Sequence, residues 1–250
     1  MKVFLGVGHG GSDSGAVANG FKEKDLNLSI ALACQAELIR HGVTVMMERT
    51  SDIGLTSNQA VKMCNDFAPD VAVDIHNNAG GGDGAEVFHH HLGGTSKKLA
   101  VNILDEIVKV GQNSRGAKIR LNDNGNDYYY FIRDIVAPSV IVECAFVDHK
   151  TDIQIIDTEA ERKVMGAAIA KGILRTLGIE YKAPEVTAPT TSKYFSDVPA
   201  NAWYADSVDY CKEHGLMDGV GDGKFNPNEP LTRAQMATVT ARLHKMLSEK

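Results

Sequence analysis

Apolar residues between positions 1 and 178 alternate between two periodicities. Short runs that are apolar throughout, such as Val71-Ala72-Val73 and Val140-Ile141-Val142, are typical of strands covered on both faces. Longer segments in which apolar residues recur every three or four positions indicate helices. The pattern predicts strands at Lys2–Gly8, Val43–Glu48, Val71–His76, Ala85–His90 and Ser139–Cys144, with a weaker one near Tyr130–Arg133. It predicts helices at about 24–41, 56–68, 95–110 and 158–177.

Local signals mark several helix ends, and the order of the elements indicates the fold class. Thr56-x-x-Gln59 and Thr158-x-x-Glu161 match the capping box, in which two side chains close the first helical turn. Gly42 and Gly178 are natural stops for the helices before them. Alternating strands and helices predict an α/β fold, an open, mostly parallel twisted sheet with helices on both faces.

The composition changes twice after residue 178 and predicts a second, smaller domain. Residues 1–179 make up the α/β domain. Residues 180–193 hold Pro184, Pro189 and several Thr and Ser without apolar periodicity, which is typical of a semi-extended linker. Residues 194–250 form a short unit, rich in aromatic residues, Asp and Gly, that ends in a helix. We expect a small helical module there.

Composition and charge narrow the class of protein. With 43% apolar and 23% charged residues, the 250-residue chain has the composition of a globular protein. Its formal net charge of −6 gives no reason to expect a nucleic acid or an anionic membrane as a partner. No apolar run approaches the length of a membrane span.

Cysteine spacing and the first residues bear on the cellular compartment. The cysteines form no C-x-x-C pair and are predicted to be buried free thiols, which suits a reducing cytosol: Cys34, Cys64, Cys144 and Cys211. Too few apolar residues follow Lys2 to make the core of a signal peptide, and cleavage nearby would remove His9. We expect synthesis in the cytoplasm without a signal peptide. Secretion is the alternative, because a chain trimmed of its leader would look the same.

Four residues with metal-binding or acid–base chemistry lie at edges of the predicted elements. His9, His76 and Glu143 each follow a predicted strand, and Glu23 lies where a helix begins. Sites in open α/β sheets form beyond the carboxyl ends of the strands, so we expect these side chains to meet. Two His and one carboxylate make a catalytic zinc shell with an open position, and a further carboxylate can act as general base. The pattern predicts a zinc hydrolase.

Two other motifs suggest different chemistry. Residues 6–11 match the dinucleotide-binding pattern G-x-G-x-x-G, but no helix opens after the third glycine, which disfavours that interpretation. His89-His90-His91 suggests a second metal site. Because successive strand residues point to opposite faces, we expect three adjacent imidazoles to converge poorly, and a strand-end role is favoured.

Six segments within 1–178 carry a family resemblance: Gly8-His9-Gly10-Gly11-x-Asp13-x-Gly15-Ala16, Glu23-Lys24-Asp25-Leu26-Asn27-Leu28, Ile75-His76-Asn77-Asn78-Ala79, Gly84-Ala85-Glu86-Val87-Phe88, Ser114-Arg115-Gly116-x-Lys118 and Pro138-Ser139-Val140-Ile141-Val142-Glu143. In this order they resemble the zinc-dependent N-acetylmuramoyl-L-alanine amidases of autolysins and phage endolysins, often called amidase type 3. The resemblance implies one Zn2+ per catalytic domain, held by His9, Glu23 and His76. It implies Glu143 as the catalytic carboxylate and peptidoglycan as the substrate.

The resemblance also implies substrate contacts and leaves a few differences. Asn78 and Arg115 are candidates to line the saccharide-peptide groove, with a turn former and a surface charge as the simpler alternatives. Three positions depart from the family pattern without removing a ligand: Asp74 where Ser is common, Cys144 after the catalytic Glu, and His149 where Asn is frequent.

Motifs of the C-terminal unit follow a second pattern: Phe195-Ser196-Asp197-Val198-Pro199, Trp203-Tyr204, Gly215, Asp222-Gly223-x-Phe225-x-Pro227 and Leu231-Thr232-Arg233-Ala234. They resemble the S-layer homology module over about 194–245. The resemblance implies two helices and binding to a secondary cell-wall polymer, with Arg233 and Trp203 as candidate contacts. Gln235 replaces the usual Glu but preserves a capping box with Thr232.

The module is present in one copy, whereas such modules usually occur as three. We expect a single copy to bind weakly, or to associate with other chains through its exposed faces. The alternative is an appendage that only stabilises the fold.

The sequence therefore predicts a modular peptidoglycan hydrolase that cleaves the amide between the N-acetylmuramoyl lactyl group and L-alanine. A phage endolysin is favoured, and a secreted autolysin of the same activity is the nearest alternative. A wall-binding or S-layer-associated protein with an inactive amidase fold is a second alternative, disfavoured by the intact set of four residues. A zinc peptidase that cuts within the stem peptide is a third, because zinc chemistry alone does not select the amide.

Overall fold

A mostly parallel sheet forms the centre of the first of two compact units, which are Met1–Lys182 and Ala183–Lys250. The structure is a computed structural model that describes residues 1–183 and 191–248. Six strands lie in the order β4-β1-β5-β8-β6-β7. They are β1 (Lys2–Val7), β4 (Thr44–Met47), β5 (Val71–Asn78), β6 (Ala85–His89), β7 (Ser114–Lys118) and β8 (Ser139–Phe146). β4, β1, β5 and β8 are parallel, whereas β6 pairs antiparallel with β8 and parallel with β7. The predicted fold class is confirmed.

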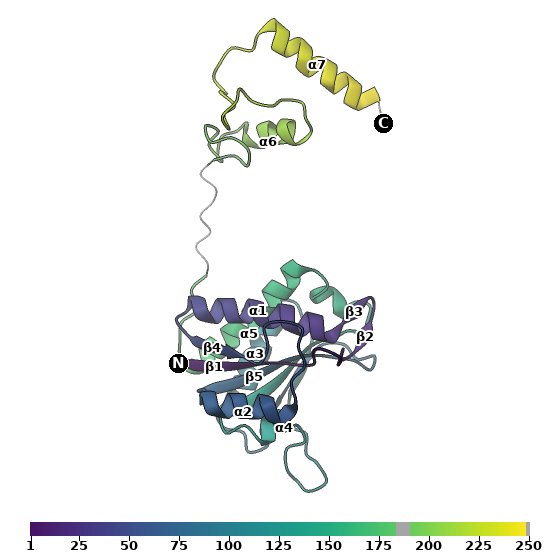
Figure 1. The fold of residues 1–250 in the computed structure, drawn as a ribbon, viewed down its shortest axis with the longest axis vertical. Helices are drawn as coiled ribbons and strands as arrows, with labels where there is room; N and C mark the ends of the chain where they lie inside the picture. Colours follow the sequence, from purple (N-terminus) through teal and green to yellow (C-terminus); the bar gives the residue numbers. More distant parts are fainter. Residues whose placement is uncertain (184–190, 249–250) are drawn as a thin grey trace. The chain divides into compact units, whose positions relative to one another are not determined.

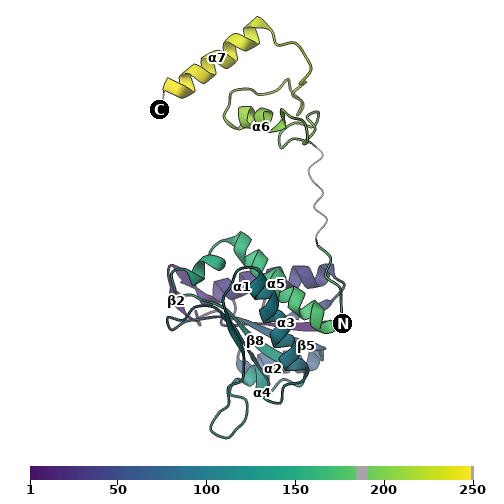
Figure 2. The same ribbon diagram turned by 180° about the vertical axis from the view of Figure 1, so that it is seen from behind.

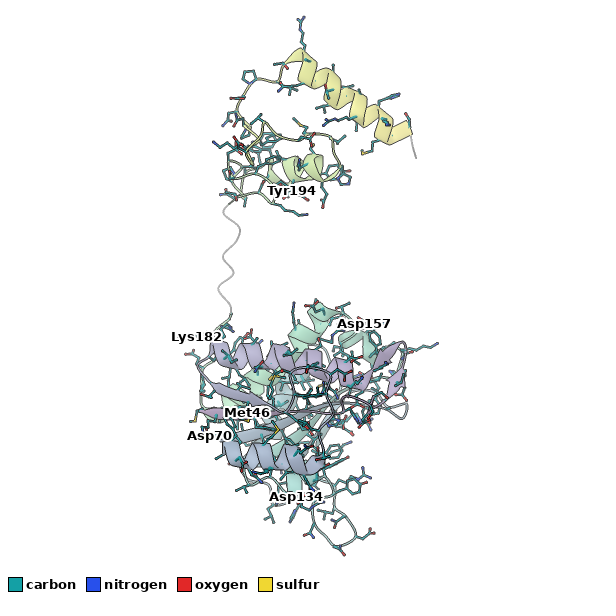
Figure 3. All side chains as sticks on the ribbon, in the orientation of Figure 1. Met46, Asp70, Asp134, Asp157, Lys182 and Tyr194 are labelled. Carbon is teal, nitrogen blue, oxygen red and sulfur yellow. The ribbon has the colours of Figure 1, made fainter. Side chains whose placement is uncertain are left out.

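Helices cover both faces of this sheet (Figures 1 and 2). One face carries α1 (Glu23–Arg40), α3 (Thr95–Lys109) and α5 (Glu159–Leu177), and the other carries α2 (Ser57–Phe67) and α4 (Tyr130–Arg133). Leu5 packs into the first layer and its neighbour Phe4 into the second, and neither is exposed to solvent. Side chains fill the space between sheet and helices (Figure 3). Burial on both faces explains why the central strands are apolar throughout.

The sequence signals for helix ends act as expected. Thr56 and Thr158 both form complete capping boxes, with Gln59 and Glu161 as their respective partners. Gly178 ends α5 with a left-handed backbone, at φ 73°.

One predicted strand is wrong, and several elements are additional to those predicted. Tyr130–Arg133, expected as a weak strand, forms the short helix α4, whose Phe131 and Ile132 are buried against the sheet. An apolar run this short has no periodicity that separates a strand from a helical turn. β7 was not predicted because its residues are mostly polar, as suits an edge strand. The additional elements are β2 (Val17–Ala18), β3 (Phe21–Lys22) and a 3-10 helix at Asp152–Ile155.

The second unit contains α6 (Ala205–Glu213) and α7 (Arg233–Ser248) beside a small apolar cluster. The buried members of this cluster are Phe195, Val198, Ala205 and Val208. The Asp197 carboxylate accepts hydrogen bonds from the backbone N–H groups of Phe225 (2.9 Å) and Asn226 (2.8 Å). These bonds hold the loop between α6 and α7 in place. Thr232 and Gln235 form the expected capping contacts at the start of α7.

The segment predicted as a linker, 180–193, includes residues 184–190, which lie outside the described residues. Just before them, Tyr181 stacks on His41 with ring centroids 4.9 Å apart, and the Lys182 N–H donates to His41 Nε2 (2.9 Å). Residues 181 and 182 therefore pack on the first unit.

All four cysteines are free thiols; Cys211 is only partly buried, whereas the other three are buried as predicted. None of the helices in the described ranges combines the length and apolar character needed to cross a bilayer.

Candidate active site

The side chains of His9, Glu23, His76 and Glu143 meet at the carboxyl end of the parallel strands. His9 follows β1, Glu23 is the first residue of α1, and His76 and Glu143 lie side by side in register on β5 and β8. Glu23 Oε2 lies 3.1 Å from His9 Nε2, and Glu23 Oε1 lies 3.1 Å from His76 Nδ1. The structure thus brings together all four residues that the sequence analysis selected.

Glycines let the backbone approach these side chains. A Cβ atom on Gly8 would lie 2.1 Å from His76 Cε1, and one on Gly15 would lie 2.6 Å from Glu23 Oε2. Any other residue at these two positions would displace a site residue, because Cβ contacts under 3.0 Å essentially never occur. The glycine-rich loop after β1 is therefore shaped around the site.

A second carboxylate orients each imidazole. Asp13 Oδ2 lies 2.8 Å from His9 Nδ1, and Asp74 Oδ2 lies 3.2 Å from His76 Nε2. The other nitrogen of each ring faces Glu23, an arrangement that fixes ring orientation and tautomer in metal sites. Donor atoms of His9, Glu23 and His76 all lie within 4.8 Å of one another. Two imidazoles and one carboxylate with carboxylate-oriented rings suit zinc, so these residues fit the expected metal.

The charges at the site favour an ionised Glu23. Burial opposes ionisation, but hydrogen bonds from His76 and His9 prevail and hold the pKa of Glu23 well below its usual range. In the metal-free protein, the hydrogen bond to Glu23 raises the pKa of His9. Burial lowers the pKa of His76, but the charge of Asp74 and hydrogen bonds to Asp74 and Glu23 outweigh burial, so the net pKa is raised. A metal cation that replaces the protons between the two imidazoles and Glu23 would contact a carboxylate that is already ionised and in position.

Glu143 has the opposite character. Its Oε2 atom is buried and has no hydrogen-bond partner among the described residues. Burial raises its pKa to about 7, helped by the charges of Glu23 and Glu86, although His76 opposes the rise. A carboxyl group with a pKa near neutrality can both accept and deliver a proton.

A cavity of about 300 Å³ opens at three of the four candidate residues, and Glu23 is not among the residues that line it. His9, His76 and Glu143 line it, together with Asp13, Glu48, Ser57, Asp74, Tyr129 and Tyr130. Glu48 was not selected from the sequence, although it directly follows β4 and so obeys the same strand-end rule. Burial and the charge of Asp74 raise its pKa to about 7. Tyr129 and Tyr130 contribute two aromatic side chains to the lining of the cavity.

Asn78 and Arg115 lie beside the site and not among the residues that line its cavity. Both bind Glu86: Asn78 Nδ2 donates to Oε1 (3.0 Å) and Arg115 Nε donates to Oε2 (2.8 Å). Glu86 is the register partner of Glu143 on the neighbouring strand. The guanidinium of Arg115 also lies over the ring of Phe146, 4.9 Å from its centroid.

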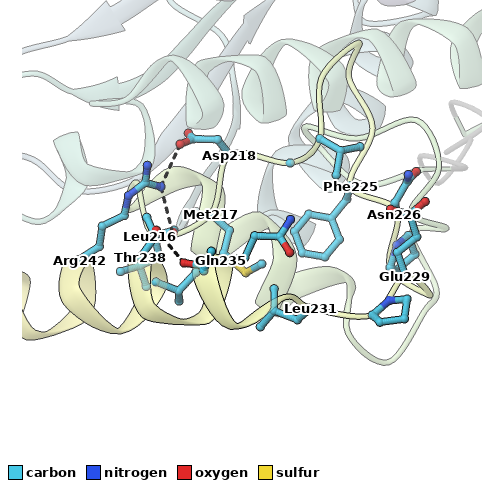
Figure 4. Close-up of a pocket in the computed structure, with 16 residues that line it drawn as sticks. Leu216, Met217, Asp218, Phe225, Asn226, Glu229, Leu231, Gln235, Thr238 and Arg242 are labelled. Carbon is cyan, nitrogen blue, oxygen red and sulfur yellow. Dashed lines mark hydrogen bonds and ion pairs between the residues drawn. The ribbon is translucent and has the colours of Figure 1, made fainter.

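The two C-terminal candidates, Trp203 and Arg233, lie on the surface of the second unit. Trp203 is 93% exposed, and Arg233 is the exposed first residue of α7. Neither lines the cavity of about 520 Å³ between α7 and the preceding loops. Figure 4 shows this cavity, where Arg242 donates to Asp218 (2.9 Å) and to the Leu216 carbonyl (3.2 Å).

A family model described as N-acetylmuramoyl-L-alanine amidase matches residues 3–175. The chain belongs to this amidase family. A model of the S-layer homology domain matches residues 194–237. The family match spans all four residues of the candidate active site.

Individual relatives agree with this assignment. The chain is similar to the N-acetylmuramoyl-L-alanine amidase CwlM of Bacillus licheniformis, with 32% identity over 188 residues that cover 73% of this chain and 71% of CwlM. It is 30% identical over 190 residues to an endolysin of Bacillus phage SPP1, covering 72% of this chain and 68% of the endolysin.

Solved structures show the same similarity over the first unit. The catalytic domain of the amidase CwlV from Bacillus (Paenibacillus) polymyxa matches with a TM-score of 0.64 and 26% identity, over 72% of this chain and 99% of that chain. Cwp6 from Clostridium difficile matches with a TM-score of 0.69 and 37% identity, over 70% of this chain and 29% of that chain.

Replacing Glu143 with Gln is predicted to stabilise the metal-free protein at alkaline pH. The pKa of this carboxyl rises from 4.5 to about 7 on folding, so its ionisation opposes folding as the pH increases through that interval. At pH 8 the free energy of unfolding should rise by up to about 3 kcal/mol, since a tenfold change in proton affinity is worth about 1.4 kcal/mol. Urea unfolding in the presence of a chelator measures this gain, which should disappear near pH 4.5.

Glu86→Gln is a control in which the free energy of unfolding should change in the opposite direction. Burial works against ionisation of Glu86, but Lys118 and Arg115 prevail and lower its pKa, so its charge supports folding above the usual pKa. This variant should lose stability at pH 8. A Glu143→Gln protein with no gain at pH 8, or with the same gain at both pH values, would contradict the electrostatic account of Glu143.

Proposed function

We propose that this chain is a zinc-dependent peptidoglycan hydrolase that cleaves the amide between the N-acetylmuramoyl lactyl group and L-alanine. The observation that carries the proposal is the cluster of His9, Glu23 and His76 donor atoms, whose two imidazoles line one cavity together with Glu143. Membership of the amidase family supports the choice of bond.

In this proposal His9, Glu23 and His76 hold the zinc ion, and Asp13 and Asp74 keep the two rings in place. Zinc bound there supplies polarisation of the scissile carbonyl and lowers the pKa of water. Glu143 takes a proton from the attacking water and then delivers it to the departing amine of L-alanine. Its pKa of about 7 in the metal-free protein matches a group that must perform both transfers.

We propose that the second unit binds a secondary cell-wall polymer and concentrates the enzyme on its substrate. The match to the S-layer homology domain supports this role, and Arg233 and Trp203 offer an exposed cation and an exposed aromatic ring. No residue of α7, which is described over Arg233–Ser248, is buried. This exposure supports association with a second copy, which would increase wall binding through multivalency.

Two biological settings share this chemistry. A phage endolysin is our first proposal, supported by the similarity to the SPP1 endolysin over most of the chain. A cell-wall autolysin is the second, favoured by the S-layer homology match and by similarity to Bacillus amidases.

Glu143→Ala is expected to retain zinc and to lose hydrolysis by about 10²- to 10⁴-fold, the usual contribution of a general acid–base group. His76→Ala should lose both zinc and hydrolysis. Glu159→Gln, an exposed carboxylate on α5, is the matched control and should retain both. Turbidity loss of purified walls and zinc content after dialysis measure the two properties. Near-normal turnover by Glu143→Ala would refute the role proposed for this residue.

Removing residues 194–250 is expected to lower binding to intact walls, because the proposed polymer-binding surface is lost. Cleavage of small soluble glycan-peptide fragments should be unchanged, since the first unit has its own core and site. Cosedimentation with walls and fragment cleavage measure the two effects. Arg233→Ala in the full chain tests the surface without truncation. Unchanged binding by both proteins would favour an appendage that only stabilises the fold.

A further inference from the structure

A second group of metal-ligating side chains lies outside the candidate active site. Among the described residues, His90, His91 and Asp127 form the one other cluster whose donor atoms lie within 4.8 Å of one another. Asp127 Oδ2 lies 2.8 Å from His91 Nδ1 and 3.2 Å from His90 Nε2. These distances resemble the 3.1 Å spacings between Glu23 and its two imidazoles.

The expectation that the three adjacent histidines converge poorly is wrong for two of them. β6 ends at His89, so the alternation of a strand no longer applies to His90 and His91. Their rings are stacked, 4.6 Å apart and 24° from parallel, and both face Asp127. His89 is buried, and its Nδ1 contacts the His90 carbonyl.

The Asp127 carboxylate is held in place by the backbone. Its Oδ1 accepts the His91 N–H (3.0 Å), which leaves Oδ2 directed at the two imidazoles. The Asp127 side chain is 3% exposed, whereas those of His90 and His91 are 34% and 31% exposed. A buried carboxylate below two partly exposed rings gives a preformed anionic site that an ion can reach from solvent.

We propose that His90, His91 and Asp127 form a second metal site that takes a divalent transition cation such as Zn2+. Two imidazoles and one carboxylate suit such ions and leave further positions for water. The site is separate from the candidate active site. Along antiparallel β6, Glu86 lies opposite Glu143 but His89 lies opposite Val140, roughly 10 Å further along the strand.

The hydrogen bonds of His90 indicate that this site is the weaker of the two. Its Nδ1 accepts the Leu92 N–H (3.2 Å), so the neutral ring carries its proton on Nε2, facing Asp127. A cation on Nε2 moves the proton to Nδ1 and breaks the contact with Leu92. At the candidate active site, Asp13 and Asp74 instead accept the proton on the outer nitrogen.

A cation at this position would connect the end of β6 to the segment that supports the catalytic cavity. Asp127 closes a loop through its bridge to Leu121, and its carbonyl accepts from Arg133 Nη1 (3.2 Å). Tyr129 and Tyr130, which line the cavity, follow within three residues. The second ion would therefore stabilise the wall of the active site without contacting the substrate.

Equilibrium dialysis of the full chain against Zn2+ tests this proposal. The wild type should bind a tight equivalent and a second, weaker one. His90→Gln/His91→Gln should lose the weaker equivalent alone, because Gln retains a donor to Asp127 but is a poor zinc ligand. His76→Ala should lose the tight equivalent alone. His244→Ala, an exposed histidine of α7, is the matched control and should bind as the wild type does.

Asp127→Asn provides a second test, because it keeps an acceptor for the His91 N–H and removes only the charge. It should also lose the weaker equivalent, with a circular dichroism spectrum like that of the wild type. A single equivalent in the wild type, or a weaker equivalent that persists in both the double variant and Asp127→Asn, would overturn the proposal. Neither result depends on whether the enzyme cleaves peptidoglycan.

Discussion

The buried carboxylate of Glu23 is the interaction on which the rest of the site depends. It is only 4% exposed, and a buried charge is costly unless it is paired and hydrogen-bonded. Two imidazoles face it, and backbone N–H groups of Ala16 (3.0 Å) and Asn77 (3.1 Å) donate to it. These donors come from the loop after β1 and from β5. Satisfying one charge therefore requires the strands, the glycine loop and the start of α1 to be in place together.

Glu143 lies next to this satisfied charge with one oxygen unpartnered among the described residues. The contrast suits the two different tasks proposed for these carboxylates. Glu23 is stabilised as an anion, as its proposed role of metal ligand requires, whereas burial keeps a proton on Glu143 up to about pH 7. Environments that move the pKa values of neighbouring carboxyl groups apart are typical of sites with distinct ligand and acid–base roles. Ionisation of this buried carboxyl destabilises the fold, so Glu143 is better suited to a role in catalysis than to one in stability.

Strand-end reasoning located much of the site from the sequence, because parallel strands bring their carboxyl ends to one edge. His9, His76 and Glu143 are found this way, and Glu48 could have been. The helix at Tyr130–Arg133 was missed because a short apolar run carries no periodicity, and its conformation depends on packing against the sheet. The pairing of His90 and His91 with Asp127 was missed for a related reason. The pairing depends on the end of β6 at His89 and on the contact of His91 with Asp127, 36 residues further along the chain. The residues near the histidines in the sequence indicate neither feature.

The most direct test of the account is end-group analysis of purified peptidoglycan digested by the full chain, with zinc and with a chelator. The account predicts new N-terminal L-alanine in the presence of zinc and none after chelation. New amino termini elsewhere in the stem peptide would contradict it and indicate a peptidase. Walls that are bound with zinc present but gain no new amines would indicate a binding protein with an inactive amidase fold.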